Sequence, residues 1–198
     1  MKREKFNILE STCVPLPLTN IDTDQIIPAR FLSATSKEGF GKNLFRDWRY
    51  DKEGNEIPDF ILNRPVYRGT ILITGSNFGC GSSREHAVWA IRDHGFRAVV
   101  SDSFADIFRN NALNNGLLPV QIPSTALIEL TKQIILNPGT IVKIDLERQL
   151  ISSEETGLSA PFSINAFRKQ CLLSGLDNID FLLEMKEEII AFEQSRSL

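Results

Sequence analysis

The sequence predicts an α/β fold built around a parallel β-sheet. Buried strands are expected at 70–75, 96–101 and 117–122, because each is a short run of mostly apolar and β-branched residues. Amphipathic helical segments at 82–95 and 103–116 separate these strands, and a glycine ends each helix. Strands that alternate with helices of this length are typical of βαβ units, whose strands pair in parallel.

The chain before the first of these strands is less regular. Residues 6–18 alternate loosely between apolar and polar, and they predict an edge strand or barrel strand, since Pro15 and Pro17 block further pairing. Residues 33–69 are rich in glycine, asparagine and charge, yet they contain several aromatic residues. We expect an excursion from the core here, mobile in part, with one or two short helices near 40–48.

After the third predicted strand, the sequence predicts further helices and strands. Residues 124–139 predict a helix, 140–153 predict two strands or one bent strand, and 160–164 predict a short strand. The last segment, 165–197, predicts two helices broken near Ser174–Gly175. Its final helix is amphipathic, and we expect the apolar face to pack on the body of the protein rather than on a partner. The apolar positions are Leu176, Ile179, Leu182, Leu183, Ile189, Ile190 and Phe192.

Length and charge narrow the class of protein. A chain of 198 residues predicts a single domain over 1–198. Its net charge of -3 argues against nucleic-acid binding, which usually requires a basic excess. No apolar run approaches the roughly 18 residues of a membrane helix. The charged N-terminus lacks the apolar core of a signal peptide, so we expect a cytoplasmic protein with no membrane partner.

The cysteines and histidines do not form a metal-binding pattern. Cys13, Cys80 and Cys171 are widely spaced and odd in number, which predicts free thiols. They lack the close spacing of zinc and iron–sulfur sites. With His86 and His94 as the only histidines, we expect no transition-metal site built by this chain alone, whereas a carboxylate site for magnesium stays open.

The segment Asn77–Ala87 (NFGCGSSREHA) joins a buried strand to a helix and concentrates polar groups. Gly79 and Gly81 allow the backbone to turn tightly and to bring its amides close to a ligand. The start of the helix presents unpaired N–H groups and the positive end of the helix dipole. Arg84 adds a planar guanidinium that can bind a carboxylate through two hydrogen bonds. The pattern therefore predicts an anion site.

Two other interpretations of this loop are open. Ser82 and Glu85 have the spacing of a capping box, which would explain both residues without a ligand. Cys80 could be a nucleophile, since a helix N-terminus lowers the pKa of a thiol, with His86 as its base. The capping box does not account for the glycines or for Ser83, and the common glycine-rich phosphate fingerprints are absent. The anion site is the interpretation we prefer.

Three motifs in order resemble the small subunit of 3-isopropylmalate dehydratase. They are NIDTDQIIPARFL at 20–32, GSNFGCGSSREHA at 75–87 and SFADIFRNNALNNGLLPV at 103–120. The resemblance covers nearly the whole chain and implies an aconitase-like swivel domain, a β/β/α arrangement with a barrel-like sheet and flanking helices. It also implies a hydro-lyase that isomerises 2-isopropylmalate and 3-isopropylmalate in leucine biosynthesis. A separate large subunit would form a heterodimer with this chain and carry a 4Fe-4S cluster, with no cofactor on this chain.

The resemblance also implies roles for individual residues. Ser82 matches the base that removes a proton from carbon, and Ser83 and Arg84 match positions that bind a substrate carboxylate. Arg30 is a further candidate for substrate binding. The residues expected to support the loop are Gly79, Gly81, Glu85, Asp22, Thr23, Asp24 and Asn111.

The resemblance leaves the substrate open among related hydroxy acids. The small subunit of a citramalate/citraconate or homoaconitate hydro-lyase would differ by only a methyl or carboxyl group in its substrate. A non-catalytic anion-binding module and a thiol enzyme that uses Cys80 are the alternatives from other classes. The complete Gly-Ser-Ser-Arg set favours a catalytic subunit.

Overall fold

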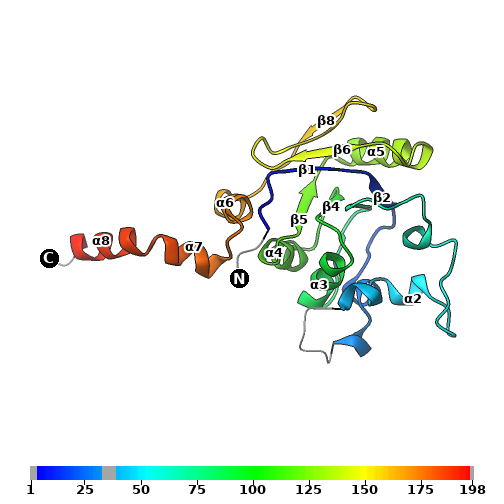
Figure 1. The fold of residues 1–198 in the computed structure, drawn as a ribbon, viewed down its shortest axis with the longest axis horizontal. Coiled ribbons are helices and arrows are strands. Elements are labelled where there is room, and N and C mark those ends of the chain that lie inside the picture. Colours follow the sequence, from blue (N-terminus) through cyan, green and yellow to red (C-terminus); the bar gives the residue numbers. More distant parts are fainter. Residues whose placement is uncertain (1–3, 33–38, 197–198) are drawn as a thin grey trace.

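The computed structural model describes residues 4–32 and 39–196, which contain two four-stranded β-sheets with helices around them (Figure 1). The parallel sheet has the order β2-β3-β4-β5, and its strands are β2 Cys13–Leu16, β3 Ile71–Thr74, β4 Ala98–Ser101 and β5 Leu118–Gln121. The antiparallel sheet has the order β1-β6-β7-β8, and its strands are β1 Ile8–Ser11, β6 Val142–Asp145, β7 Leu150–Ser153 and β8 Leu158–Pro161.

The α/β class and the three predicted parallel strands are confirmed. Every residue of β3 and β4 is buried, as their mostly apolar sequences predict. Helix α3 (Glu85–Asp93) connects β3 to β4, and α4 (Asp106–Asn114) connects β4 to β5. Parallel pairing brings the carboxyl ends of neighbouring strands to one edge of the sheet, where the candidate loop begins.

The N-terminal segment forms two strands where one was expected. β1 lies at the edge of the antiparallel sheet, and β2 lies at the edge of the parallel sheet, so the chain changes sheets at Thr12. Gly69 is required at this crossing, because a Cβ there would lie 1.8 Å from the carbonyl oxygen of Thr12. Both sheets have open edges, so the expected barrel-like arrangement is not confirmed.

Residues 39–69 contain the expected short helices, whereas the expected excursion from the core and its mobility remain predictions. A 3-10 helix at Phe40–Asn43 and the α-helix α2 at Arg46–Arg49 lie within the predicted region, and a further 3-10 helix covers Ile61–Asn63. The rings of Phe45, Trp48 and Phe60 pack together, with centroids 5.5 to 6.2 Å apart. The first part of the predicted excursion, 33–38, lies outside the described residues.

Helix α5 (Ser124–Leu136) contacts β2 and β4 of the parallel sheet and β8 of the antiparallel sheet. It matches the predicted helix at 124–139. Of the two alternatives for 140–153, the structure has two strands, and β8 begins two residues before the predicted short strand.

The C-terminal segment forms three helices, α6 (Ala166–Ser174), α7 (Asn178–Glu184) and α8 (Lys186–Arg196). The predicted break is present, because Gly175 adopts a left-handed conformation with φ 70°. The predicted packing of the last helix on the body is wrong, since α7 and α8 extend away from both sheets (Figure 1). Their apolar side chains are exposed, with Ile179 at 69%, Leu183 at 62% and Phe192 at 59%.

Candidate active site

The loop after β3 turns through residues in the left-handed backbone region. Gly79 has φ 76° and Gly81 has φ 86°, and Asn77 has φ 56°. A Cβ on Gly79 would lie 2.2 Å from Cγ of Phe108, so glycine is needed there for space as well as for conformation. These turns carry the chain from the end of the sheet to the start of α3.

The capping box proposed for Ser82 and Glu85 is not present. Helix α3 begins at Glu85 with Arg84 at the N-cap position, and no side chain caps it. A capping box occurs instead at the short helix α1 (Thr23–Ile26), where Gln25 N donates to Asp22 Oδ1 at 2.8 Å and Asp22 N donates to Gln25 Oε1 at 2.9 Å. The side chain of Ser82 is therefore not used in starting the helix.

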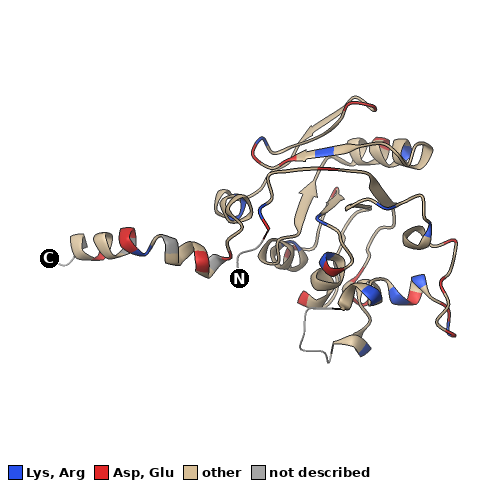
Figure 2. Cartoon of the chain, in the orientation of Figure 1, with Lys and Arg blue, Asp and Glu red and all other residues tan. Residues whose placement is uncertain are grey.

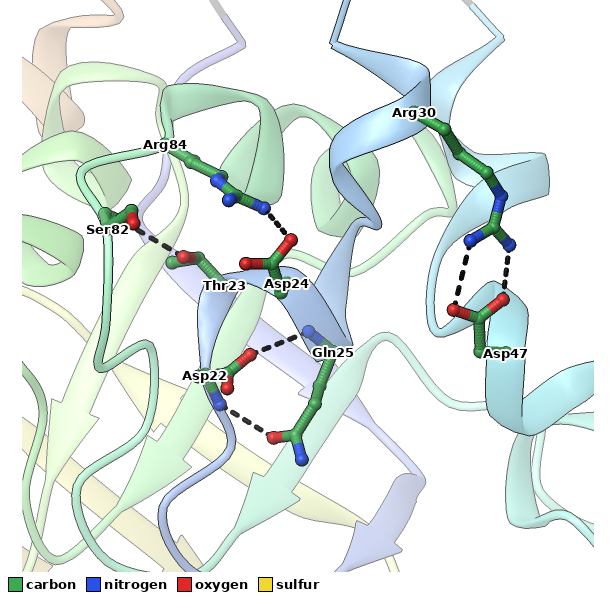
Figure 3. Close-up of polar contacts among 8 residues, drawn as sticks. All are labelled: Asp22, Thr23, Asp24, Gln25, Arg30, Asp47, Ser82 and Arg84. Carbon is green, nitrogen blue, oxygen red and sulfur yellow. Dashed lines mark hydrogen bonds and ion pairs between the residues drawn. The ribbon is translucent and has the colours of Figure 1, made fainter.

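Residues 21–23 hold the loop after β3 in place through hydrogen bonds. Gly79 N donates to the carbonyl of Ile21 at 2.8 Å, and Thr23 N donates to the carbonyl of Cys80 at 2.9 Å. The buried Thr23 hydroxyl donates to the carbonyl of Ser82 at 2.9 Å (Figure 3). These bonds fix the backbone on both sides of Gly81 and leave the Ser82 hydroxyl uninvolved.

Arg84 and Asp24 form an ion pair across the same junction (Figure 3). The Arg84 side chain is 14% exposed and that of Asp24 is 55% exposed. The hydrogen bond from the Arg84 guanidinium lowers the pKa of Asp24 below its usual value, and this effect exceeds the opposing effect of burial. The ion pair therefore holds the Arg84 guanidinium against Asp24 of α1.

Ser82 and Ser83 are both exposed, directly before Arg84. Within the described ranges, no group forms a hydrogen bond with the Ser82 hydroxyl. The structure thus brings together Ser82, Ser83 and Arg84, and it adds Asp22, Thr23 and Asp24 from α1 and its cap. An exposed hydroxyl beside a guanidinium and an uncapped helix start is an arrangement that can bind a carboxylate.

The structure does not bring Arg30 into this group. Arg30 lies on a 3-10 helix at Ala29–Phe31 and pairs with Asp47 of α2 (Figure 3). Both side chains are more than half exposed, at 55% and 59%. A role of Arg30 in substrate binding remains a prediction.

Asn115 was not identified from the sequence, although it connects the end of α4 to the start of α3. Its Nδ2 donates to Glu85 Oε1 at 2.7 Å, and its Oδ1 accepts from Trp89 Nε1 at 3.1 Å. Asn111, the residue expected to support the loop, is half-buried on α4, and its carbonyl accepts a bond from Asn115 Nδ2 at 2.9 Å. Asn111 and Asn115 are one helical turn apart, and sequence spacing alone did not distinguish them.

A hydrogen-bond network around Asp102, which was not identified from the sequence, follows β4. Ser76 Oγ donates to Asp102 Oδ2 at 2.9 Å, and Ser124 Oγ donates to the same oxygen at 2.8 Å. The backbone N–H of Asn77 donates to Ser103 Oγ at 2.8 Å. Burial raises the pKa of Asp102, but the three serine hydroxyls around it outweigh burial and lower it. This network anchors the beginning of the loop to the neighbouring strand.

The histidines contact aromatic rings and backbone. His86 lies against Phe40 and Trp89, with ring centroids 5.5 and 4.5 Å apart. His94 caps the end of α3, and its Nδ1 lies 3.2 Å from the carbonyl of Gly41. Burial, and then the charge of Arg49, lower the pKa of His94 below its usual value.

Within residues 4–32 and 39–196, no group of three or more histidine, cysteine, aspartate or glutamate side chains is placed to hold a metal ion. Cys13 and Cys171 are buried and Cys80 is half-buried, and burial raises the pKa of the Cys13 thiol. Basic and acidic residues are interspersed over the drawn elements (Figure 2). Across the same part of the chain, no helix combines the length and apolarity that crossing a membrane requires.

Comparisons with known proteins identify the family of the chain. The family model of the aconitase C-terminal domain matches residues 3–125. A 3-isopropylmalate dehydratase small subunit from Azobacteroides pseudotrichonymphae is 57% identical, with 97% of this chain and 98% of the relative covered. The protein of the same name from Christiangramia forsetii is 58% identical, with 98% and 94% covered.

A solved structure is also similar. It is the crystal structure of 3-isopropylmalate dehydratase from Methanocaldococcus jannaschii, with a TM-score of 0.67 and 28% identity. The similarity covers 94% of this chain and 99% of that chain. The chain therefore belongs to the aconitase C-terminal domain family and, within it, to the 3-isopropylmalate dehydratase small subunits.

Proposed function

We propose that this chain is the small subunit of a hydro-lyase that isomerises 2-isopropylmalate and 3-isopropylmalate by dehydration and rehydration in leucine biosynthesis. The names of its relatives support this reading over a citramalate/citraconate or homoaconitate enzyme. The same names imply a large subunit, with which the chain would form the active heterodimer. The prediction of a single domain over 1–198 and that of a cytoplasmic location belong to this proposal.

One observation carries the catalytic part of the proposal, namely the exposed Ser82 hydroxyl beside Arg84 at the uncapped start of α3. Ser82 Oγ is the group that would take a proton from the substrate carbon. A serine hydroxyl is a weak base, so its ionised form needs stabilisation. The positive end of the α3 helix dipole and the Arg84 guanidinium can supply it, since both favour negative charge.

Ser83 and Arg84 would bind a carboxylate of the substrate. Arg84 is the stronger candidate, because a guanidinium can form two parallel hydrogen bonds with a carboxylate. The ion pair with Asp24 holds that guanidinium in place before the substrate arrives. Gly79, Gly81, Thr23 and Asp22 would keep the loop in this shape.

We assign the 4Fe-4S cluster to the large subunit, as membership in the 3-isopropylmalate dehydratase small subunits implies. A 4Fe-4S cluster there would supply a Lewis acid for the leaving hydroxyl group. The chain described here would contribute the proton acceptor and the carboxylate-binding groups.

The proposal can be tested by co-expressing the chain with its large subunit and measuring turnover of isopropylmalate, citramalate and homocitrate in parallel. We expect isopropylmalate to be preferred and the isolated chain to be inactive. Ser82→Ala should reduce turnover by about 10²–10⁴-fold while the two subunits still co-purify. Cys80→Ser should retain most of the activity. Near-normal turnover of Ser82→Ala would remove Ser82 from the mechanism.

A further inference from the structure

A cleft lies between α4 and the beginning of α6, beside β5 at the edge of the parallel sheet. Its volume of about 560 Å³ is in the range of small-molecule pockets. The side chains that matter for its chemistry are Asp106, Arg109 and Leu113 of α4, Pro119 of β5, Ile164, and Arg168 of α6. None of these residues belongs to the loop that carries Ser82 and Arg84.

Arg109 lines the cleft without a carboxylate partner in the described part of the chain. Its guanidinium donates to the carbonyl of Ser163 at 3.2 Å and to Gln121 Oε1 at 3.5 Å, and both acceptors are neutral. Arg168 reaches the cleft from the opposite helix, where its Nη1 donates to Asn114 Oδ1 at 2.6 Å. Two arginine side chains that line one cleft favour a carboxylate ligand.

The α4 wall of the cleft presents three kinds of group in order along the helix. Asp106 is exposed and lies one turn before Arg109, yet the two are not within ion-pair distance of each other. Leu113 lies one turn after Arg109, and Ile164 and Pro119 extend this apolar surface. Residues three or four positions apart on a helix are roughly 5–6 Å apart at Cβ, so a negative, a positive and an apolar group line up at that spacing.

We infer that this cleft binds an α-amino acid with an aliphatic side chain. The carboxylate of such a ligand would bind Arg109 and Arg168, its ammonium group would bind Asp106, and its side chain would contact Leu113 and Ile164. The ammonium and carboxylate of an α-amino acid are attached to one carbon, which suits binding groups one helical turn apart. A hydroxy diacid fits less well, since its second carboxylate would meet Asp106.

The test is isothermal titration calorimetry on the full-length chain with L-leucine as the probe. We expect saturable binding of L-leucine. Three probes each lack one part of it: 4-methylpentanoate lacks the ammonium group, 3-methylbutylamine lacks the carboxylate, and glycine lacks the side chain. Each should bind at least about tenfold more weakly, as should inorganic phosphate.

Variants assign the binding to this cleft. Arg109→Gln should weaken L-leucine binding at least about tenfold, and Asp106→Asn should do the same without disturbing the fold, because Asp106 is exposed. Arg148→Gln is the matched control, since its side chain is 81% exposed and lies outside the cleft. Arg84→Gln should also bind L-leucine normally.

Three results would overturn the inference. One is the absence of saturable binding of L-leucine. Another is equal binding of phosphate or 4-methylpentanoate, which would indicate a general anion site. The third is normal L-leucine binding by both Arg109→Gln and Asp106→Asn. If Arg84→Gln is then the variant that loses binding, the ligand lies in the loop after β3.

Discussion

Asp24 and Arg84 are 60 positions apart in the sequence, and their side chains form an ion pair that connects α1 to the start of α3. The Arg84 side chain is largely buried, whereas that of Asp24 stays more than half exposed. The guanidinium is thus held beside Ser82 and Ser83 in one orientation, which reduces the entropy lost when a carboxylate binds.

Replacing Arg84 by lysine tests whether the shape of the guanidinium matters. Arg84→Lys keeps the positive charge but loses the paired donors, so kcat/KM of the reconstituted enzyme should fall at least about tenfold. Steady-state kinetics with 3-isopropylmalate measures the effect. Arg30→Lys is the comparison, and we expect a smaller loss, because Arg30 pairs with Asp47. An equal loss in both variants would give Arg30 a direct role in binding.

Removing the charge of Asp24 tests the orienting role of the ion pair. Asp24→Asn should lower kcat/KM by about threefold to tenfold, because Arg84 then samples more conformations before the substrate binds. Asp47→Asn is the matched control, since Asp47 is similarly exposed and pairs with Arg30 instead. It should change kcat/KM by less than about twofold, as is usual for an exposed ion pair. Unchanged kinetics in Asp24→Asn would show that Arg84 needs no such support.

Gly79 should be the least replaceable glycine of the loop. Gly79→Ala combines a left-handed backbone with a Cβ placed 2.2 Å from Phe108, so we expect a loss of at least about 3 kcal/mol in the free energy of unfolding. Gly157 has a similar φ of 68° but nothing within 4 Å of the added Cβ. Gly157→Ala should therefore cost only about 1–2 kcal/mol. Urea unfolding of both variants, followed by circular dichroism, separates steric clash from backbone strain.

His94 makes the stability of the fold dependent on pH. Burial, followed by the charge of Arg49, lowers the pKa of His94 in the folded state. The unfolded chain, with a histidine pKa of about 6.5, then binds more protons than the folded chain. This contribution to stability is complete above pH 6.5 and is lost as the pH falls toward the folded-state pKa.

Urea midpoints measured between pH 5 and pH 8 test this dependence. We expect the midpoint of the unaltered chain to fall on acidification across the upper part of this range. His94→Gln should lose that component, whereas the control His86→Gln should keep it. A slope that persists in His94→Gln would assign the effect to other groups.

The C-terminal helix α8 should add little to the stability of the body. Its apolar side chains Ile190 and Phe192 are exposed, so removing residues 186–198 takes away little buried apolar surface. We expect the free energy of unfolding to change by less than about 1 kcal/mol. Thermal unfolding of the truncated chain measures it. A large loss would mean that α8 packs on the body in solution, as the sequence first suggested.

Much of the fold followed from local patterns. Short apolar runs at β3, β4 and β5, each separated by a helix that ends at glycine, were sufficient to predict a parallel sheet. The glycines after β3 likewise identified the loop that bears Ser82 and Arg84. These features depend on residues close together in the chain, so periodicity and turn preferences reveal them.

Contacts between distant residues were decided by the tertiary structure. Asp24 and Asn115 both reach the start of α3 from other elements, and no spacing rule relates positions 24, 85 and 115. The start of α3 was misplaced for the same reason, because Thr23 bonds to Ser82 and Asp24 pairs with Arg84, whose backbone is extended.

The sequence by itself determined the α/β class, the order of the central strands and the loop with its serines and arginine, because backbone preference and hydrophobic periodicity are local. The tertiary structure alone decided which carboxylate pairs with Arg84. It also decided that the Ser82 hydroxyl does not cap α3, and that α7 and α8 extend away from the two sheets. Those outcomes depend on which surfaces meet when distant segments pack, and the burial gained there is not a property of any one segment.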